Sequence, residues 1–122
     1  MMLKVALLGG GSWGTTVASV VSRNAPITLW ARDSATVDEI NQSHCNSRYL
    51  PGIKLPKALR ATASLQDAVS SADVVIMAIP SSNFREVLQD VAQHIRPWVP
   101  VISLTKGLEL ASGKRMSEVI VE

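Results

Sequence analysis

The sequence predicts an α/β fold: a single domain with a doubly wound parallel sheet between two layers of helices, a three-layer α/β/α arrangement. Five short apolar stretches alternate with helical patterns along the 122 residues, and parallel strands need such helical crossovers. Hydrophobic residues make up 47% of the chain and charged residues 18%, which is typical of strands buried on both faces. The length suits one domain with a substantial core.

The first strand, helix and second strand give the clearest pattern. Residues 4–8 form a short apolar run that glycine ends, which predicts a buried strand. Residues at the spacing of one helix face follow: Gly14, Val17, Ala18 and Val21. Pro26 ends this helix, and residues 27–30 form the second strand.

The middle of the chain predicts a short helix, a loop and a weak strand. Thr36 and Glu39 match a capping box at the start of the helix. Residues 44–57 hold two prolines and a glycine, which indicates a long loop. Residues 60–63 form the third strand.

A second capping box, Ser64 with Asp67, opens a helix that we expect to reach Ala72. Residues 73–80 are the most apolar strand, and we expect it to be central in the sheet. Asn83 is the expected cap of the next helix, which begins at about Phe84. Its apolar stripe consists of Phe84, Val87, Leu88, Val91, Ala92 and Ile95.

The fifth strand covers residues 101–104, and residues 108–115 form a connection. A helical pattern begins at Met116 and is still running at Glu122, which suggests that the chain is a fragment of a longer protein.

Composition argues against several classes of function. The formal net charge is only +2 with no run of basic residues, which argues against nucleic-acid binding. Glycine interrupts the N-terminal apolar run early, so neither a signal peptide nor a membrane span is expected. The single cysteine, Cys45, excludes an internal disulfide and is compatible with the cytoplasm. His44 and His94 lack the spacing of metal ligands.

The junction of the first strand and helix carries the motif Gly9-x-Gly11-x-x-Gly14, typical of dinucleotide binding in a Rossmann-type sheet. Gly9 permits the tight turn, Gly11 lets the backbone approach a pyrophosphate, and Gly14 lets the helix pack closely on the strand. Gly10 occupies a variable position that the motif does not require.

The two other residues of the motif have alternative roles. Ser12 is expected to donate its hydroxyl to a phosphate, or else it only caps the helix. Trp13 is expected to flank the cofactor, or else it packs in the core.

The end of the second strand bears on the choice of cofactor. Arg32 lies where a ribose-binding group is expected, and a guanidinium there suits the 2′-phosphate of NADP. Asp33 follows it and is a candidate for the ribose hydroxyls of NAD. NADP or NAD is therefore the predicted cofactor, with NADP favoured.

Two further residues stand at strand ends, where ligands of doubly wound sheets bind. Pro80 is expected to hold the following loop against the cofactor, or else it only ends the strand. Lys106 is the only lysine at a strand end and is expected to hold the cofactor or an anionic substrate by charge, or else it is an exposed lysine.

Together these stretches resemble a known family. The series GGGSWGTTVA, LWAR, YLPG, KLP, AIPS, SLTKGLE and MSEVI is similar to the N-terminal domain of bacterial NAD(P)-dependent glycerol-3-phosphate dehydrogenase. The resemblance covers almost the whole chain, and YLPG and TKGLE are more specific than the glycines. Gly10 is a departure, because the family commonly has alanine there.

The resemblance implies reversible hydride transfer between sn-glycerol 3-phosphate and dihydroxyacetone phosphate, feeding phospholipid synthesis in the cytoplasm. It implies cofactor contacts at Ser12, Trp13, Arg32 and Lys106, with Lys106 also touching the substrate. Residues 49–52 and Phe84 would line the cleft. The family's helical second domain, which carries the proton-transfer lysine and much of the homodimer contact, is absent from this chain. No catalytic residue is therefore assigned here, and the chain alone is expected to be inactive.

Two alternatives stay open. One is the cofactor domain of a related reductase, similar to ketopantoate reductase or hydroxyacyl-CoA dehydrogenase. The other is a nucleotide-sensing module without catalysis.

Overall fold

The structure, a computed structural model, describes residues 3–104. Its elements, in chain order, are β1 (Val5–Leu8), α1 (Ser12–Val21), β2 (Ile27–Trp30), α2 (Ser34–Ser43), β3 (Arg60–Thr62), α3 (Leu65–Val69), β4 (Val74–Met77), α4 (Ser81–Ala92) and β5 (Val101–Ser103). The predicted connection over 108–115 and the helical pattern from Met116 lie outside the described residues.

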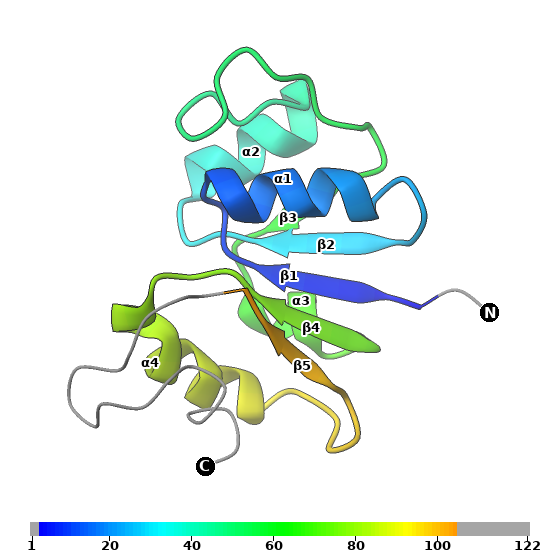
Figure 1. Ribbon diagram of the computed structural model, residues 1–122, viewed down its shortest axis with the longest axis vertical. Coiled ribbons are helices and arrows are strands. Elements are labelled where there is room, and N and C mark those ends of the chain that lie inside the picture. The colour runs from blue at the N-terminus through cyan, green and yellow to red at the C-terminus, as the bar shows by residue number, and fades with distance from the viewer. Residues whose placement is uncertain (1–2, 105–122) are drawn as a thin grey trace.

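The five strands form one sheet in the order β3-β2-β1-β4-β5, and every neighbouring pair is parallel. The last residues of the strands stand in one row, because Leu8 pairs with both Trp30 and Met77. Figure 1 shows the arrowheads pointing to one side of the molecule, where α1, α2 and α4 begin. The doubly wound parallel sheet is confirmed. β4 is an interior strand as expected, although β1 holds the centre.

Helices cover both faces of the sheet, which gives the predicted three layers (Figure 1). Leu7 and Leu8 are both fully buried because successive strand residues point to opposite faces. Leu7 joins the core under α1 and α2, with Ala18, Leu29 and Ile40. Leu8 joins the core under α3 and α4.

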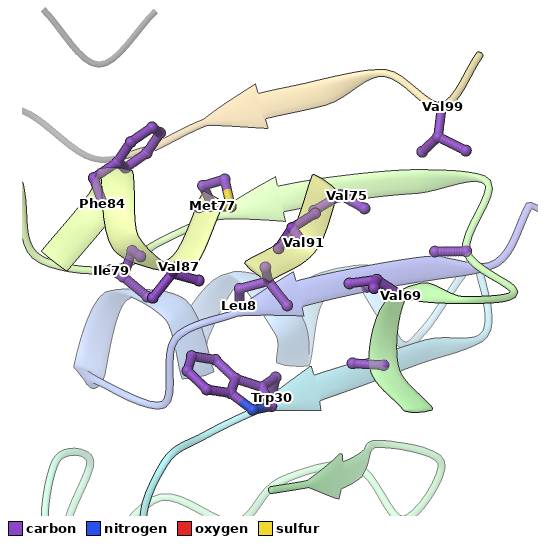
Figure 2. Close-up of a cluster of buried hydrophobic side chains, with 13 residues drawn as sticks. Leu8, Trp30, Val69, Val75, Met77, Ile79, Phe84, Val87, Val91 and Val99 are labelled. Carbon is purple, nitrogen blue, oxygen red and sulfur yellow. The ribbon is translucent and has the colours of Figure 1, made fainter. Parts of the chain in front are cut away.

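Helix α4 supplies Phe84, the largest of the fully buried side chains in that second core. Phe84, Val87 and Val91 lie on its inner face and pack toward Met77 and neighbouring strand residues (Figure 2). Phe84 is fully buried. Of the apolar stripe read from the sequence, α4 buries Phe84, Val87 and Val91. Leu88 and Ile95 are half-buried, with Ile95 beyond the end of the helix, and Ala92 is exposed.

Two helices begin where the sequence did not predict. Asp33 caps α2 by accepting a hydrogen bond from the N–H of Ala35 at 3.0 Å. Thr36 lies inside the first turn, buried, and donates its hydroxyl to Asp33 at 3.3 Å, so its prediction as the cap was wrong. Asp33 prevails because it stands where the chain leaves β2, and aspartate is a strong N-cap.

The prediction of Asn83 as the cap of α4 was also wrong, because the helix begins one turn earlier and Pro80 is its N-cap. The capping role of Ser64 is confirmed: its hydroxyl accepts from the N–H of Asp67 at 3.2 Å. Helix α3 ends at Val69, before the expected Ala72.

None of the helices within residues 3–104 has both the length and the hydrophobicity that a membrane crossing requires.

Candidate functional site

A cleft with a volume of about 470 Å³ opens at the carboxyl edge of the sheet. Three strand-to-helix junctions and one loop form its walls. The lining consists of residues 9–13 after β1, residues 30–33 with Thr36 around the end of β2, residues 78–80 with Asn83 and Val87 after β4, and Tyr49. This is the edge where doubly wound sheets bind their ligands.

The glycine turn is built by close packing of backbone on backbone. Gly9 has a φ of +133°, and a Cβ there would come within 2.2 Å of the Ala78 carbonyl oxygen. A Cβ on Gly14 would come within 2.2 Å of the Gly9 carbonyl oxygen. Neither position accepts a side chain without movement of the main chain. Gly14 lies behind the cleft wall, in keeping with a role in helix packing.

Gly11 differs from these two glycines. A Cβ on it would meet no atom within 4 Å, and the residue lines the cleft. It is the N-cap of α1, which no side chain caps and whose first turn holds no acidic residue. The first amides of a helix have no partner inside the helix, and the positive end of its dipole lies there. The geometry therefore favours an anion such as a phosphate at this point.

Gly10 is more constrained than the sequence suggested. A Cβ there would lie 2.8 Å from the Cβ of Ala31, a rigid neighbour at the end of β2. Packing thus requires glycine at a position that the motif leaves variable.

Ser12 and Trp13 both line the cleft. Ser12 is the first residue of α1 and makes no capping hydrogen bond, so the interpretation of its hydroxyl as a cap was wrong. The Trp13 side chain is 61% exposed, which overturns the alternative that it packs in the core. Trp30, by contrast, is buried and donates its indole N–H to the Ala63 carbonyl at 3.1 Å.

The wall after β2 carries the charged residues of the cleft lining, Arg32 and Asp33. Arg32 is exposed, and its guanidinium stands over the ring of Trp30 with 5.9 Å to the ring centroid. The Asp33 carboxylate is held by the first turn of α2 and forms an ion pair with Arg48 at 3.5 Å. Arg48 in turn lies 5.1 Å from the centroid of the Tyr49 ring. The acidic group of this wall is thus engaged, while one guanidinium faces the cleft.

The remaining predicted residues have different outcomes. Pro80 lines the cleft, but α4 follows it directly, without the expected loop. Of residues 49–52, which the resemblance placed in the cleft, Tyr49 lines it and residues 50–52 do not. Phe84 does not, because it is fully buried in the core, so that expectation was wrong. Lys106 lies outside the described residues.

Sequence reasoning missed Asn46, a fully buried polar residue in the loop after α2. Its amide group binds the glycine turn, 36 residues away in the sequence. Periodicity holds no signal for such a contact. The long loop was the one available signal. A long ordered loop needs hydrogen-bond partners for its polar groups, so a buried polar side chain such as Asn46 could have been expected in it.

Among the side chains of residues 3–104, neither histidine lies in a cluster that could hold a metal ion. His44 is the C-cap of α2, in the left-handed region with a φ of 56°. Within residues 3–104, no three histidine, cysteine or acidic side chains come together in a way that could hold a metal ion.

Comparisons with known proteins agree with this geometry. A glycerol-3-phosphate dehydrogenase (NAD(P)+) of Sphingopyxis alaskensis is 69% identical over 120 residues, which are 98% of this chain and 36% of that protein. A counterpart from Mycobacterium avium is 52% identical over 98% of this chain and 35% of its own length. A crystal structure of glycerol-3-phosphate dehydrogenase from Coxiella burnetii matches with a TM-score of 0.91 and 32% identity, over 98% of this chain and 37% of that one.

The chain thus spans little more than a third of the length of these relatives. A diketoreductase, at 19% identity and a TM-score of 0.66, shares the fold alone. The alternatives of a related reductase and of a sensor are not favoured. A family profile described as NAD-dependent glycerol-3-phosphate dehydrogenase N-terminus matches residues 4–122. The chain therefore belongs to the family of NAD-dependent glycerol-3-phosphate dehydrogenase N-terminal domains.

Proposed function

We propose that the chain binds a nicotinamide dinucleotide in the cleft at the carboxyl edge of the sheet. The observation that carries the proposal is the glycine turn, which leaves Gly11 open to the cleft at the uncapped start of α1. A pyrophosphate fits there by charge and by hydrogen bonding to main-chain amides. Ser12, Trp13 and Pro80 line the same cleft and contact the bound cofactor.

NADP(H) is the preferred cofactor. Asp33 caps α2 and pairs with Arg48, so its carboxylate has little capacity left for ribose hydroxyls. Arg32 is exposed at the cleft, and within residues 3–104 no ion pair engages it. A guanidinium in that place suits the 2′-phosphate.

The domain serves an enzyme that interconverts sn-glycerol 3-phosphate and dihydroxyacetone phosphate, for phospholipid synthesis in the cytoplasm. A bound nicotinamide cofactor supplies the hydride-transfer chemistry. This chain's residues bind and orient it, and Lys106 contacts both cofactor and substrate. The proton-transfer group and the homodimer contact belong to a further, helical domain. The 122-residue chain alone therefore binds cofactor without oxidising glycerol 3-phosphate.

The test is a titration of the purified chain with NADPH and with NADH, for wild type, Arg32→Ala and Arg60→Ala. Arg60 is a matched control, because it is an exposed arginine at the start of β3, away from the cleft. Arg32→Ala is expected to weaken NADPH binding by about 1–3 kcal/mol, the scale for a charged hydrogen-bonding partner, and to leave NADH nearly unchanged.

Three results would contradict the proposal. If neither NADPH nor NADH binds to the chain, the cleft is not a site for a nicotinamide dinucleotide. Equal losses for NADPH and NADH would show that Arg32 acts through adenine or through the fold. Oxidation of glycerol 3-phosphate by the chain alone would disprove the division of labour between domains.

A further inference from the structure

Asn46 joins two separate walls of the cleft through one buried side chain. Its Nδ2 donates to the Gly10 carbonyl oxygen at 2.9 Å and lies 2.9 Å from Thr15 Oγ1. The Thr15 hydroxyl itself donates to the same carbonyl at 3.3 Å. Asn46 and Thr15 are both fully buried. A hydrogen bond in such surroundings is electrostatically stronger than one in water, so this contact fixes the carbonyl firmly.

The direction of the Gly10 carbonyl decides where the next amide points. A peptide unit is planar and trans, so the N–H of Gly11 points opposite to the C=O of Gly10. With the carbonyl turned toward Asn46 and Thr15, the N–H of Gly11 is turned away from them. Gly11 is also the residue whose Cα faces open space at the cleft.

The main chain of Asn46 holds the second wall. Its carbonyl oxygen accepts from the N–H of Leu50 at 2.8 Å, which closes a turn over residues 46–50. Arg48 and Tyr49 project from that turn, the first to Asp33 and the second into the cleft lining. One residue thus sets the loop and the glycine turn in a fixed relation.

We propose that Asn46 is a positioning residue for cofactor binding, which aims the Gly11 amide at the pyrophosphate and holds the loop with Tyr49 against the same ligand. This rests on the proposed function of the cleft. Binding is stronger when donors and walls are already in place, because less ordering is needed as the ligand arrives.

The test compares Asn46→Ala with Asn41→Ala. Asn41 is a matched control because its side chain also makes two hydrogen bonds to the main chain, both 2.9 Å, with Ala61 in β3. Calorimetry gives the Kd for NADPH, two-dimensional NMR follows the Gly11 amide, and thermal unfolding without cofactor reports stability. Thr15→Val is a milder second variant, because it removes one hydroxyl and keeps the shape of the side chain.

We expect Asn46→Ala to raise the Kd about tenfold, the scale of a lost buried hydrogen bond, and to move the Gly11 signal. Asn41→Ala should lower the unfolding midpoint while leaving the Kd and that signal unchanged. If Asn46→Ala does not fold, Thr15→Val is expected to raise the Kd about threefold with a smaller shift of the signal.

An unchanged Kd in the folded Asn46 variant, or in Thr15→Val when it alone folds, overturns the inference. So does an equal rise of the Kd in Asn41→Ala. If wild type binds neither NADPH nor NADH, the proposed function itself fails. If wild type binds cofactor and the Asn46 variant binds it equally well, only the present inference fails.

Discussion

The glycine motif should separate, by substitution, into a packing position and a ligand position. Gly14→Ala places a Cβ 2.2 Å from the Gly9 carbonyl oxygen, more than 1 Å short of the 3.4 Å where ordinary contact begins. The atom it meets belongs to the main chain, so no side-chain rotation relieves the overlap. Forcing extra volume into a packed site costs about 1–3 kcal/mol, and the upper end applies here.

A helix gains up to about 1 kcal/mol when alanine replaces glycine, which offsets part of that cost. The net loss expected for Gly14→Ala is therefore about 2 kcal/mol, or a fall of the unfolding midpoint by roughly 6–10 °C for a domain of this size. Urea unfolding followed by circular dichroism measures the free energy directly.

Gly11→Ala is the matched control in the same turn. Its φ of −74° and ψ of −176° are open to alanine, and a Cβ meets nothing within 4 Å. Its stability should stay within about 0.5 kcal/mol of wild type. The small penalty for alanine at the N-cap is offset because alanine gives the unfolded chain less conformational entropy than glycine does. NADPH binding should nevertheless weaken, because the methyl group stands in the cleft. Equal stability losses in the two variants, or a Gly14 variant as stable as wild type, would refute this reasoning.

Three further predictions concern the core, the rim and the pH response. Phe84→Ala should lower the free energy of unfolding by about 3–5 kcal/mol, because the ring is fully buried; a loss under 1 kcal/mol by urea unfolding would contradict that burial. Trp13→Ala should change stability by no more than about 0.5 kcal/mol, since its side chain is 61% exposed, while removing most of the fluorescence change on NADPH addition. Two hydrogen bonds hold the pKa of Asp73 below its ordinary value: the one from the N–H of Lys4 has the larger effect, and the one from the Arg96 guanidinium adds to it. The stabilisation by Asp73 is then fully present above about pH 3.9 and is lost as the pH falls through the lowered pKa. Between pH 7 and pH 2 the unfolding midpoint of Asp73→Asn should fall less than that of wild type, and parallel curves would disprove this contribution.

The order of elements could be predicted because each strand is a short apolar run and each helix shows its own period. The stripe of Phe84, Val87 and Val91 was identified correctly for the same reason. The role that the resemblance implied for Phe84 was wrong, because its ring is fully buried in the core against the sheet and does not line the cleft. Periodicity predicts which face is buried, whereas a role in a ligand site depends on where the face points.

The starts of α2 and α4 and the long-range contacts could not be predicted from the sequence, whereas the start of α3 at Ser64 could. Asp33 and Thr36 are both good caps, and the choice between them depends on where β2 releases the chain. Asn46 contacts Gly10 across 36 residues, and no local pattern encodes such a contact. The close packing at Gly14, by contrast, was expected from the glycine motif, and the open space beside Gly11 is compatible with the role expected there.

The short approach between Gly10 and Ala31 also limits how this domain can change in evolution. The two positions share room for a single methyl group, since a Cβ on Gly10 would lie 2.8 Å from that of Ala31. The effect of a substitution at one position therefore depends on the residue at the other. By this geometry, alanine should fit at position 10 when position 31 is glycine, or when the turn lies farther from β2. Relatives in which these residues differ should differ at both positions. A variant with Gly10→Ala alone or Ala31→Gly alone should have a lower free energy of unfolding than this chain.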